Sequence, residues 1–282
     1  MGKKAFEMIK RGCTALTALL LMLAFAVPQA GAESLRGYDK DKKGPRAERY
    51  QYILLGNYPY EANGEEKPVL WRVLSVKDGE ALLLSEMILD TRQVIKCETE
   101  RESEKRLFRR IADFAESDLC AWMNGEMLDT LLGEDPMRGA LVETHYGYLY
   151  PPTDEQMLSR ENGFTPARYG DETVGFPERR ATATPYAKSV KLYPDWGPSL
   201  YVHYAYDASP YWSIGFRTDK WQECIMLSLC GYNGHMSFGV YSRTGVGVRP
   251  ALTLNTALCT IASGSGTADD PFVMTYTGPA GE

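Results

Sequence analysis

Residues 69–89 read VLWRVLSVKDGEALLLSEMIL, in which two apolar runs flank residues 77–80 (KDGE). An Asp-Gly pair between two apolar runs is a strong signal for a β-hairpin with a tight turn. Successive side chains of a strand point to opposite faces, so Trp71 and Val73 share one face of the first run. We therefore predict two antiparallel strands, and we expect Trp71 to lie in the core of a sheet.

Further short strands are predicted on both sides of this hairpin. YQYILLG (50–56) reads as a first strand that Gly56 closes. Five more runs with strand character follow in the last third of the chain: YWSIGFRT (211–218), CIMLSLCG (224–231), HMSFGVY (235–241), VGVRPALTL (246–254) and PFVMTY (271–276). Glycines punctuate these runs, as is typical of strands joined by turns.

The middle third of the chain is predicted to be helical. Ser117 is placed to cap a helix, and apolar side chains then recur at helical spacing over residues 119–132. Asn124-Gly125 predicts a break in this helical stretch. We expect Trp122 and Leu128 to pack against the sheet that carries Trp71.

Two more short helices carry clear start signals. Asp135 followed by Pro136 resembles an N-cap with proline at the first helical position, which predicts a helix through Leu141. Thr153 and Gln156 have the spacing of a capping box and predict another helix, which ends at Asn162-Gly163.

These segments predict one α+β domain over residues 50–276, with a hairpin-rich antiparallel sheet and two or three short helices. Residues 33–49 are charged and nearly free of large apolar side chains, so we expect a flexible leader, and residues 277–282 form a tail. Residues 163–212 lose periodicity and form a long irregular insert, with seven Tyr or Trp over 192–212. Loops of this length inside a domain are usually functional or disordered.

The N-terminus has the three parts of a secretory signal. Lys3, Lys4, Lys10 and Arg11 form a basic opening, the run 15–27 is apolar, and residues 30–32 (AGA) precede the expected cleavage point. An uncleaved membrane anchor is the alternative, but the apolar run is short of the roughly 20 residues that span a bilayer. We predict a secreted or cell-surface protein without residues 1–32, whose location excludes most nucleotide-dependent chemistry.

The remaining chain is acidic. The full sequence has 31 Lys and Arg and 37 Asp and Glu, and removal of residues 1–32 leaves 27 and 36 of them, a formal charge of about −9. A chain with this charge is repelled by nucleic acid and by anionic membrane surfaces. We therefore expect neither a nucleic-acid partner nor membrane insertion of the mature chain, and the sequence leaves the oligomeric state open.

Five cysteines follow residue 32, namely Cys97, Cys120, Cys224, Cys230 and Cys259. An odd number cannot all pair within one chain. In one regular strand, Cys224 and Cys230 share a face roughly 20 Å apart, which is too far for the disulfide that requires Cα atoms within about 7 Å. No cysteine or histidine pair has zinc spacing, so we predict no metal and no cofactor.

Seven of these segments recur in an order that resembles a known family: LGNYPY, VLWRVLSV, ALLLSEMILD, SDLCAWMNGEML, ATPYAKS, YWSIGFRT and GVRPALTLN. Extracytoplasmic bacterial domains of unknown function typically read F-G-x-Y-P-Q, W-R-V-L, L-L-L-S-x-x-x-L-D, L-R-x-W-L-N, A-T-P-Y-A, W-L-R-S and G-V-R-P-A-L. The resemblance covers about residues 50–257. Three positions depart from this pattern: Tyr60 stands where glutamine is usual, Cys120 where arginine is usual, and SIGFRT where L-R-S is usual.

That family is distantly similar to the fold of formylglycine-generating enzymes and C-type-lectin-like proteins. The resemblance implies a hairpin-rich sheet and two helices that support a long loop region, closed by a strand that Gly247-Val248-Arg249 fits. An unrelated α+β domain is the alternative. In lectin-like folds the strand–turn region corresponding to Asn233, His235 and Arg243 lines the binding surface, so the resemblance implies a ligand role for these three residues.

We therefore predict a non-catalytic binding domain that recognises a glycan or a cell-envelope protein. Tyrosine and tryptophan on a long loop suit such contacts, although the same rings also serve as core. The predicted ligand-binding residues are Trp196, Tyr201, Tyr211, Trp212, Asn233, His235 and Arg243. The rival is an extracytoplasmic enzyme, either a lectin-fold oxidase that uses Cys224 and Cys230 or a carboxylate-based glycosidase.

Overall fold

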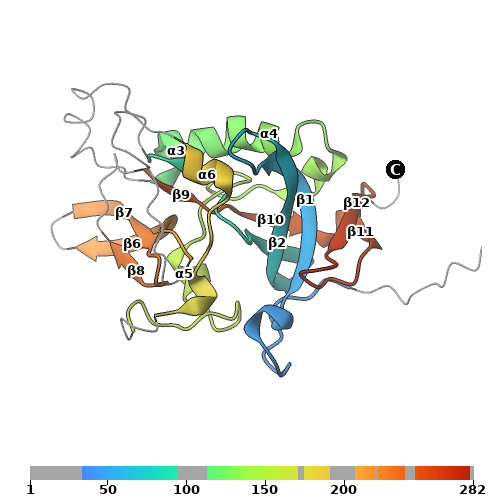
Figure 1. The fold of residues 1–282 in the computed structure, drawn as a ribbon, viewed down its shortest axis with the longest axis horizontal. Coiled ribbons are helices and arrows are strands. Elements are labelled where there is room, and N and C mark those ends of the chain that lie inside the picture. Colours follow the sequence, from blue (N-terminus) through green and yellow to red (C-terminus); the bar gives the residue numbers. More distant parts are fainter. Residues whose placement is uncertain are drawn as a thin grey trace, which may run out of the picture. The chain divides into compact units, whose positions relative to one another are not determined.

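Two β-sheets with short helices form the α+β structure that the sequence predicts (Figure 1). The structure is a computed structural model, and it describes residues 34–94, 113–170, 175–190, 207–219, 222–238 and 245–279. Residues 35–282 group as one unit. The predicted secretory signal lies outside the described residues. Within the described ranges, no helix has both the length and the apolar character needed to cross a bilayer.

The first sheet has seven strands in the order β11-β12-β1-β2-β3-β10-β5. Their bounds are β1 Gln51–Pro59, β2 Glu66–Lys77, β3 Glu80–Ser85, β5 Leu141–Val142, β10 Ala251–Asn255, β11 Cys259–Ser263 and β12 Phe272–Tyr276. Only β1 and β12 pair in parallel; the other neighbouring strands of this sheet are antiparallel.

The predicted hairpin is confirmed at the centre of this sheet. Lys77 pairs with Glu80 across the turn, and Asp78 and Gly79 have φ angles of 52° and 81°. Two positive φ angles give the turn the twist that neighbouring strands need. Trp71 is fully buried, and its indole Nε1 donates to the Leu55 carbonyl at 2.9 Å. The prediction of Trp71 in the core is therefore confirmed.

Gly56 does not close the first strand, which continues to Pro59. The register with β2 shifts between Leu54 and Asn57, so Gly56 lies in a bulge with φ of +70°. A Cβ at Gly56 would lie 2.4 Å from the carbonyl oxygen of Leu131. The glycine thus allows the helix that carries Leu131 to approach the strand, which the local sequence does not reveal.

The second sheet has the order β4-β9-β6-β7-β8. Its strands are β4 Asp90–Arg92, β6 Tyr211–Asp219, β7 Gln222–Cys230, β8 Met236–Phe238 and β9 Val246–Val248. The run 246–254, expected as one strand, is divided between the sheets, because the chain passes from β9 to β10 at Arg249-Pro250. Arg249 is fully buried at this crossing, and its Nε donates to the Ser85 carbonyl at 2.8 Å.

The helical stretch after Ser117 is continuous. α3 (Asp118–Trp122), a π-helical turn (Met123–Met127) and α4 (Leu128–Leu132) follow one another, so Asn124-Gly125 widens the helix and does not break it. Asn124 Nδ2 donates to the carbonyls of Cys120, Tyr146 and Leu149. These hydrogen bonds, two of them to the loop before α5, stabilise the π-helical turn. Ser117 caps Cys120 N at 3.0 Å, as predicted.

The other helices are short. They are α5 (Asp154–Met157), α6 (Pro185–Ser189) and, among the described residues, five 3-10 turns. These turns are η1 (Arg46–Arg49), η2 (Phe114–Glu116), η4 (Pro136–Ala140), η5 (Pro177–Arg179) and η6 (Thr256–Leu258), and the π turn carries the label η3. Asp135 caps η4, and the capping box of Thr153 and Gln156 is present. α5 ends at Met157 and not at Asn162-Gly163, because Asn162 Nδ2 turns back to the Gln156 carbonyl.

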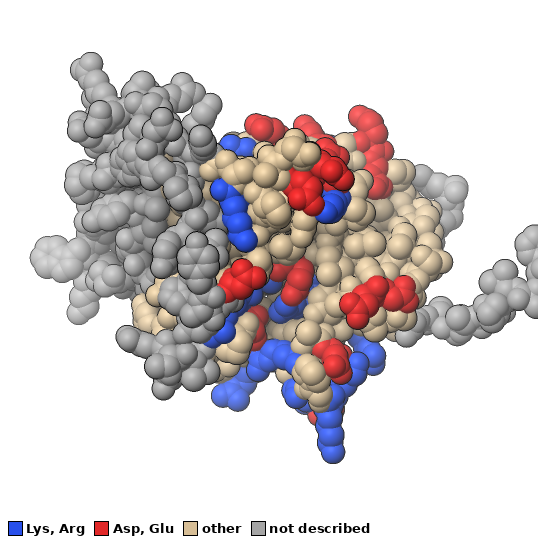
Figure 2. Space-filling model, in the orientation of Figure 1, with Lys and Arg blue, Asp and Glu red and all other residues tan. Residues whose placement is uncertain are grey.

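The leader, which we expected to be flexible, packs on the first sheet from residue 35 onward. Tyr38 N donates to the Leu74 carbonyl at 3.0 Å and Asp39 N to the Arg49 carbonyl at 2.8 Å. Arg46 lies 3.3 Å from the buried Glu178 carboxylate. Backbone hydrogen bonds and an ion pair to a buried carboxylate therefore hold this segment, which composition alone does not show. Figure 2 shows basic side chains gathered over the leader and η1.

Candidate functional site

Tyr211 and Trp212 are core residues, which corrects the prediction that they bind ligand. Both are fully buried at the start of β6. Tyr211 Oη donates to the Arg179 carbonyl at 2.6 Å, and Trp212 Nε1 donates to the Arg92 carbonyl at 2.8 Å. Because β6 lies inside the second sheet, its first rings fill the interior. Trp196, Tyr201 and Arg243 lie outside the described residues.

Asn233 and His235 lie together in the turn between β7 and β8. Asn233 Oδ1 accepts from His235 N at 3.1 Å, and the Asn233 Nδ2 lies 3.2 Å from His235 Nδ1. The imidazole lies 6.0 Å from the ring of Tyr169, which is 59% exposed. This turn therefore presents two predicted residues beside one exposed ring, and the internal hydrogen bonds already use the polar atoms of Asn233.

A larger group of polar and aromatic side chains lies where β1, β4, α3 and α6 meet. We call it the Asp90 cluster, and its members are Tyr58, Asp90, Arg92, Trp122, Glu126 and Tyr186. In Figure 1, α3 and α6 lie near β9, which pairs with β4. None of these six residues was a predicted ligand-binding residue.

Asp90 is the buried acid of the cluster. Its side chain is fully buried, Tyr58 Oη donates to Oδ2 at 2.7 Å, and Thr91 N donates to Oδ1 at 2.6 Å. Burial raises the pKa of the Asp90 carboxyl, and Arg92 and the hydrogen bonds offset only part of that effect. Burial and the neighbouring carboxylate also raise the pKa of Tyr58, so its hydroxyl stays protonated and donates.

Arg92 links the buried acid to the surface. Its Nη2 lies 3.5 Å from Asp90 Oδ2 and 3.9 Å from Glu126 Oε1, and its guanidinium lies 4.2 Å from the centre of the Trp122 ring. The side chain of Arg92 is 30% exposed and that of Glu126 73%. The cluster is therefore open to solvent on its Arg92–Glu126 side.

Two N–H groups of the cluster have no acceptor in the part of the chain that the structure describes. Arg92 Nε and Trp122 Nε1 are both buried, and among the described residues neither finds a hydrogen-bond partner. An unsatisfied buried donor costs about 1–3 kcal/mol. Buried polar groups are almost always paired in native proteins, so these two donors distinguish the Asp90 cluster from the core around Trp71, where the indole N–H is satisfied.

Tyr186 completes the cluster from α6. Its ring lies 6.3 Å from the Tyr58 ring, edge to face. Thr184 caps α6 by accepting from Ala187 N at 3.0 Å, and Thr91 Oγ1 donates to the Ala187 carbonyl at 2.8 Å. α6 is thereby attached to β4, and the half-buried Tyr186 ring is held beside Asp90. Burial and the charge of Asp90 raise the pKa of Tyr186.

Five of the seven sequence segments quoted above meet at this cluster. Four segments supply members of the cluster: Tyr58 comes from LGNYPY, Asp90 from ALLLSEMILD, Trp122 from SDLCAWMNGEML and Tyr186 from ATPYAKS. The fifth, YWSIGFRT, supplies Trp212, whose Nε1 donates to the Arg92 carbonyl. The other two segments supply the core residues Trp71 and Arg249. The order of the segments was visible in the sequence, but their convergence on one point depends on the tertiary structure.

The π-helical turn (Met123–Met127) begins directly after Trp122 and carries Glu126, so it also belongs to this site. Single π turns inside α-helices occur frequently at functional sites. Cys120, which lies two residues before Trp122 on α3, contacts the Tyr146 carbonyl with its Sγ at 3.3 Å.

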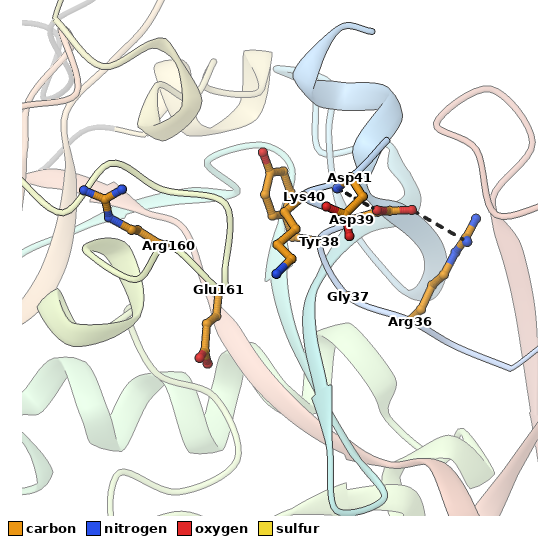
Figure 3. Close-up of a pocket in the computed structure, with 8 residues that line it drawn as sticks. All are labelled: Arg36, Gly37, Tyr38, Asp39, Lys40, Asp41, Arg160 and Glu161. Carbon is orange, nitrogen blue, oxygen red and sulfur yellow. Dashed lines mark hydrogen bonds and ion pairs between the residues drawn. The ribbon is translucent and has the colours of Figure 1, made fainter. Parts of the chain in front are cut away.

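A pocket of about 600 Å³ lies elsewhere, between the leader and residues 160–161 (Figure 3). Its lining carries three basic and three acidic side chains: Arg36, Lys40, Arg160, Asp39, Asp41 and Glu161. Asp39 Oδ1 already accepts from the backbone of Asp41 and Lys42. The charges balance at an open surface without a buried polar group, so this pocket offers less for recognition than the Asp90 cluster.

Cys230 bears on the oxidase alternative. It is a buried free thiol, and it lies with Cys224 in the single strand β7, which is the geometry on which the prediction of no Cys224–Cys230 disulfide rests. Burial raises its pKa to about 11, and its Sγ lies 3.8 Å from the Arg179 carbonyl. A protonated, enclosed thiol is a poor nucleophile and metal ligand. Among the described residues, no group of three His, Cys, Asp or Glu is arranged to hold a metal ion.

Comparison with known proteins adds no assignment. No protein-family model, curated protein or solved structure matches this chain.

Proposed function

We propose that this chain is a secreted or cell-envelope domain that binds a glycan, and that the Asp90 cluster is its binding site. One observation carries the proposal: the partly exposed Arg92 lies between the Trp122 ring and two carboxylates, and among the described residues Arg92 Nε and Trp122 Nε1 lack an acceptor. The secretory signal predicted over residues 1–32 supports the location.

A sugar ring fits the chemistry of this site. Its hydroxyl groups both donate and accept, so one hydroxyl can accept from Arg92 while donating to Glu126. Its apolar face suits the half-buried rings of Trp122 and Tyr186, which combine an apolar surface with a polar tip. Binding sites commonly join aromatic side chains with a few placed polar groups in this way.

The test is a glycan array probed with residues 33–282, followed by calorimetry on each hit. Glu126→Gln keeps the shape of an exposed side chain and removes its charge, and we expect at least a tenfold loss of affinity. Asp129→Asn, also exposed and in the following helix α4, is the matched control and should bind as the wild type does.

Equal binding by Glu126→Gln and the wild type would place the ligand elsewhere. The protein could instead capture an envelope protein and no glycan. If Glu126→Gln abolishes that capture, the Asp90 cluster remains the proposed site and its ligand is a protein. Binding that survives in Glu126→Gln but is lost in Tyr169→Ala would move the site to the turn that holds Asn233 and His235.

A carboxylate-based glycosidase is the second candidate function. Asp90 and Glu126 both lie within 3.9 Å of the same Arg92 nitrogen, and burial raises the pKa of Asp90, as general acid catalysis requires. Against it, the Asp90 side chain is fully buried and already accepts from Tyr58. Release of reducing ends from an array hit, abolished by Asp90→Asn, would favour hydrolysis over binding.

A further inference from the structure

The charges of this chain are divided unevenly between its leader and the rest. Residues 34–49 carry six basic and three acidic side chains, whereas residues 50–282 carry 21 basic and 32 acidic ones. Figure 2 shows the basic side chains of the leader and η1 gathered on one part of the surface. The net negative charge, from which the sequence predicts repulsion by anionic surfaces, therefore belongs to residues 50–282 and not to the leader.

Three lysines supply positive charge that no acid of the leader neutralises. Lys40, Lys42 and Lys43 are exposed, and none of their ammonium groups forms an ion pair with a described residue. In Figure 3, no interaction joins Lys40 to the other residues that line the pocket. These three ammonium groups are therefore available to an anion from outside the chain.

Hydrogen bonds hold the loop that carries these lysines. Asp39 Oδ1 accepts from the backbone N–H groups of Asp41 at 3.0 Å and of Lys42 at 3.1 Å, and Asp39 N donates to the Arg49 carbonyl at 2.8 Å. Arg49 Nε donates to the Gly44 carbonyl at 3.3 Å. Because the loop is already ordered, its lysines bind at a smaller cost in conformational entropy than those of a flexible tail.

We propose that the surface formed by Lys40, Lys42 and Lys43, which we call the leader face, docks on an anionic lipid surface of the cell envelope. The secretory signal predicted over residues 1–32 ends directly before the leader. The leader is thus the part of the exported chain that follows the membrane-targeting segment. The proposal is independent of the Asp90 cluster and of its ligand.

The leader face is suited to contact with lipid headgroups and not to insertion. Residues 40–48 (KDKKGPRAE) are exposed and contain no large apolar side chain. Attraction must therefore come from charge, which salt screens over about 10 Å at 0.1 M. The acidic remainder of the chain is repelled by the same surface, so the leader face alone should approach it and the chain should bind in one orientation.

The test is co-sedimentation of residues 33–282 with lipid vesicles. One set is phosphatidylcholine, and the other contains about one-third phosphatidylglycerol, which gives it a negative surface potential. We expect binding to the anionic vesicles at least tenfold tighter than to the neutral ones at roughly 0.05 M salt, and its loss at roughly 0.5 M salt.

The triple variant Lys40→Gln/Lys42→Gln/Lys43→Gln removes the charge of the leader face. One lysine beside an anionic membrane is worth roughly a fivefold change in affinity, so we expect the triple variant to bind at least about thirtyfold more weakly than the wild type. Circular dichroism checks that it is folded.

The matched control is Lys67→Gln/Arg138→Gln/Lys188→Gln, which removes the same charge outside the leader. Lys67 and Arg138 form only solvent-exposed ion pairs, and Lys188 lies in the last turn of α6. Exposed ion pairs contribute little to stability. This variant should lose less than about threefold in affinity, because its charges lie away from the docked face.

Equal binding to the two vesicle types, or no binding to the anionic ones, would overturn the proposal. Binding to soluble polyphosphate without binding to vesicles would also overturn it, since the anion would then not be a lipid surface. Equal losses in the two triple variants would show that net charge determines the affinity, and would refute the role of the leader face.

Discussion

Trp71 and Trp122 mark two regions of this molecule that use the same side chain in opposite ways. Trp71 is fully buried in the first sheet and its indole N–H donates to the Leu55 carbonyl. Trp122 is half-buried, the Arg92 guanidinium covers its ring, and its buried indole N–H has no acceptor among the described residues. The indole N–H of Trp71 is therefore satisfied within the chain, whereas the Asp90 cluster contains buried donors that have no acceptor among the described residues.

The largest expected effect on the free energy of unfolding is in the region around Trp71. Trp71→Ala removes a fully buried ring and its hydrogen bond, and truncation of a buried tryptophan costs about 3–5 kcal/mol. We expect a loss of this size in the free energy of unfolding measured with urea, or failure to fold. Trp122→Ala is the comparison and should cost less. Equal losses for the two variants would contradict the distinction drawn between the regions.

A smaller loss is expected from the hydrogen bond inside the Asp90 cluster. Tyr58→Phe keeps the ring and removes the donor to the buried Asp90 carboxylate. Hydrogen bonds to charged groups contribute about 1.5–3 kcal/mol, so urea unfolding at neutral pH should show a loss in that range. The loss should disappear in an Asp90→Asn background if the hydroxyl acts through this carboxylate, and an unchanged loss there would refute that coupling.

The third prediction concerns pH. Because the pKa of Asp90 is higher in the folded than in the unfolded chain, its stabilising contribution is complete below the unfolded value of about 4 and is lost as pH rises toward the folded value. The free energy of unfolding of the wild type should therefore fall relative to Asp90→Asn over this window, by at most about 1.4 kcal/mol per pH unit. A constant difference from pH 4 to 8 would contradict the raised pKa.

Glu86 provides the contrast for that measurement. Burial alone would raise its pKa, but the charges of Arg72 and Arg249 outweigh burial and lower it. Its contribution is therefore present above the unfolded pKa and is lost as pH falls through the folded value. Glu86→Gln should reduce the loss of stability in acid, which is the opposite pH trend to that of Asp90→Asn.

The smallest expected effect on stability is at Trp122. Trp122→Phe keeps an aromatic ring under Arg92 and removes an N–H that makes no hydrogen bond to any described residue, so we expect a change in unfolding free energy below about 1 kcal/mol. Binding of the glycan by the same variant should weaken at least tenfold, as measured by calorimetry. A variant that is destabilised like Trp71→Ala but binds normally would identify Trp122 as a core residue.

Sequence patterns were most reliable where a few adjacent residues determine the geometry. The Asp78-Gly79 turn, the Ser117 cap, the start at Asp135 and the capping box of Thr153 are all as predicted. Each depends on backbone φ angles or on hydrogen bonds that reach only two or three residues along the chain. Such contacts form in the same way wherever the segment lies in the fold.

The predictions that failed depend on contacts between distant segments. Gly56 permits the approach of α4, Asn124 binds the loop 146–149, and Arg46 reaches Gly163 and Glu178. In each case the residue has a local interpretation, as a strand end, a helix break or a solvated charge. The distant partner changes that interpretation.

The sequence by itself determined the α+β class, the central hairpin and most helix starts, because periodicity and capping are local properties of the chain. The segments that carry Tyr58, Asp90, Trp122 and Tyr186 could also be recognised in the sequence as motifs in a fixed order. Only the tertiary structure decided that Tyr211 and Trp212 are buried and that those four residues meet around Arg92. The physical reason is that burial and convergence are set by which elements pack together, and side chains that face one point need share no spacing along the chain.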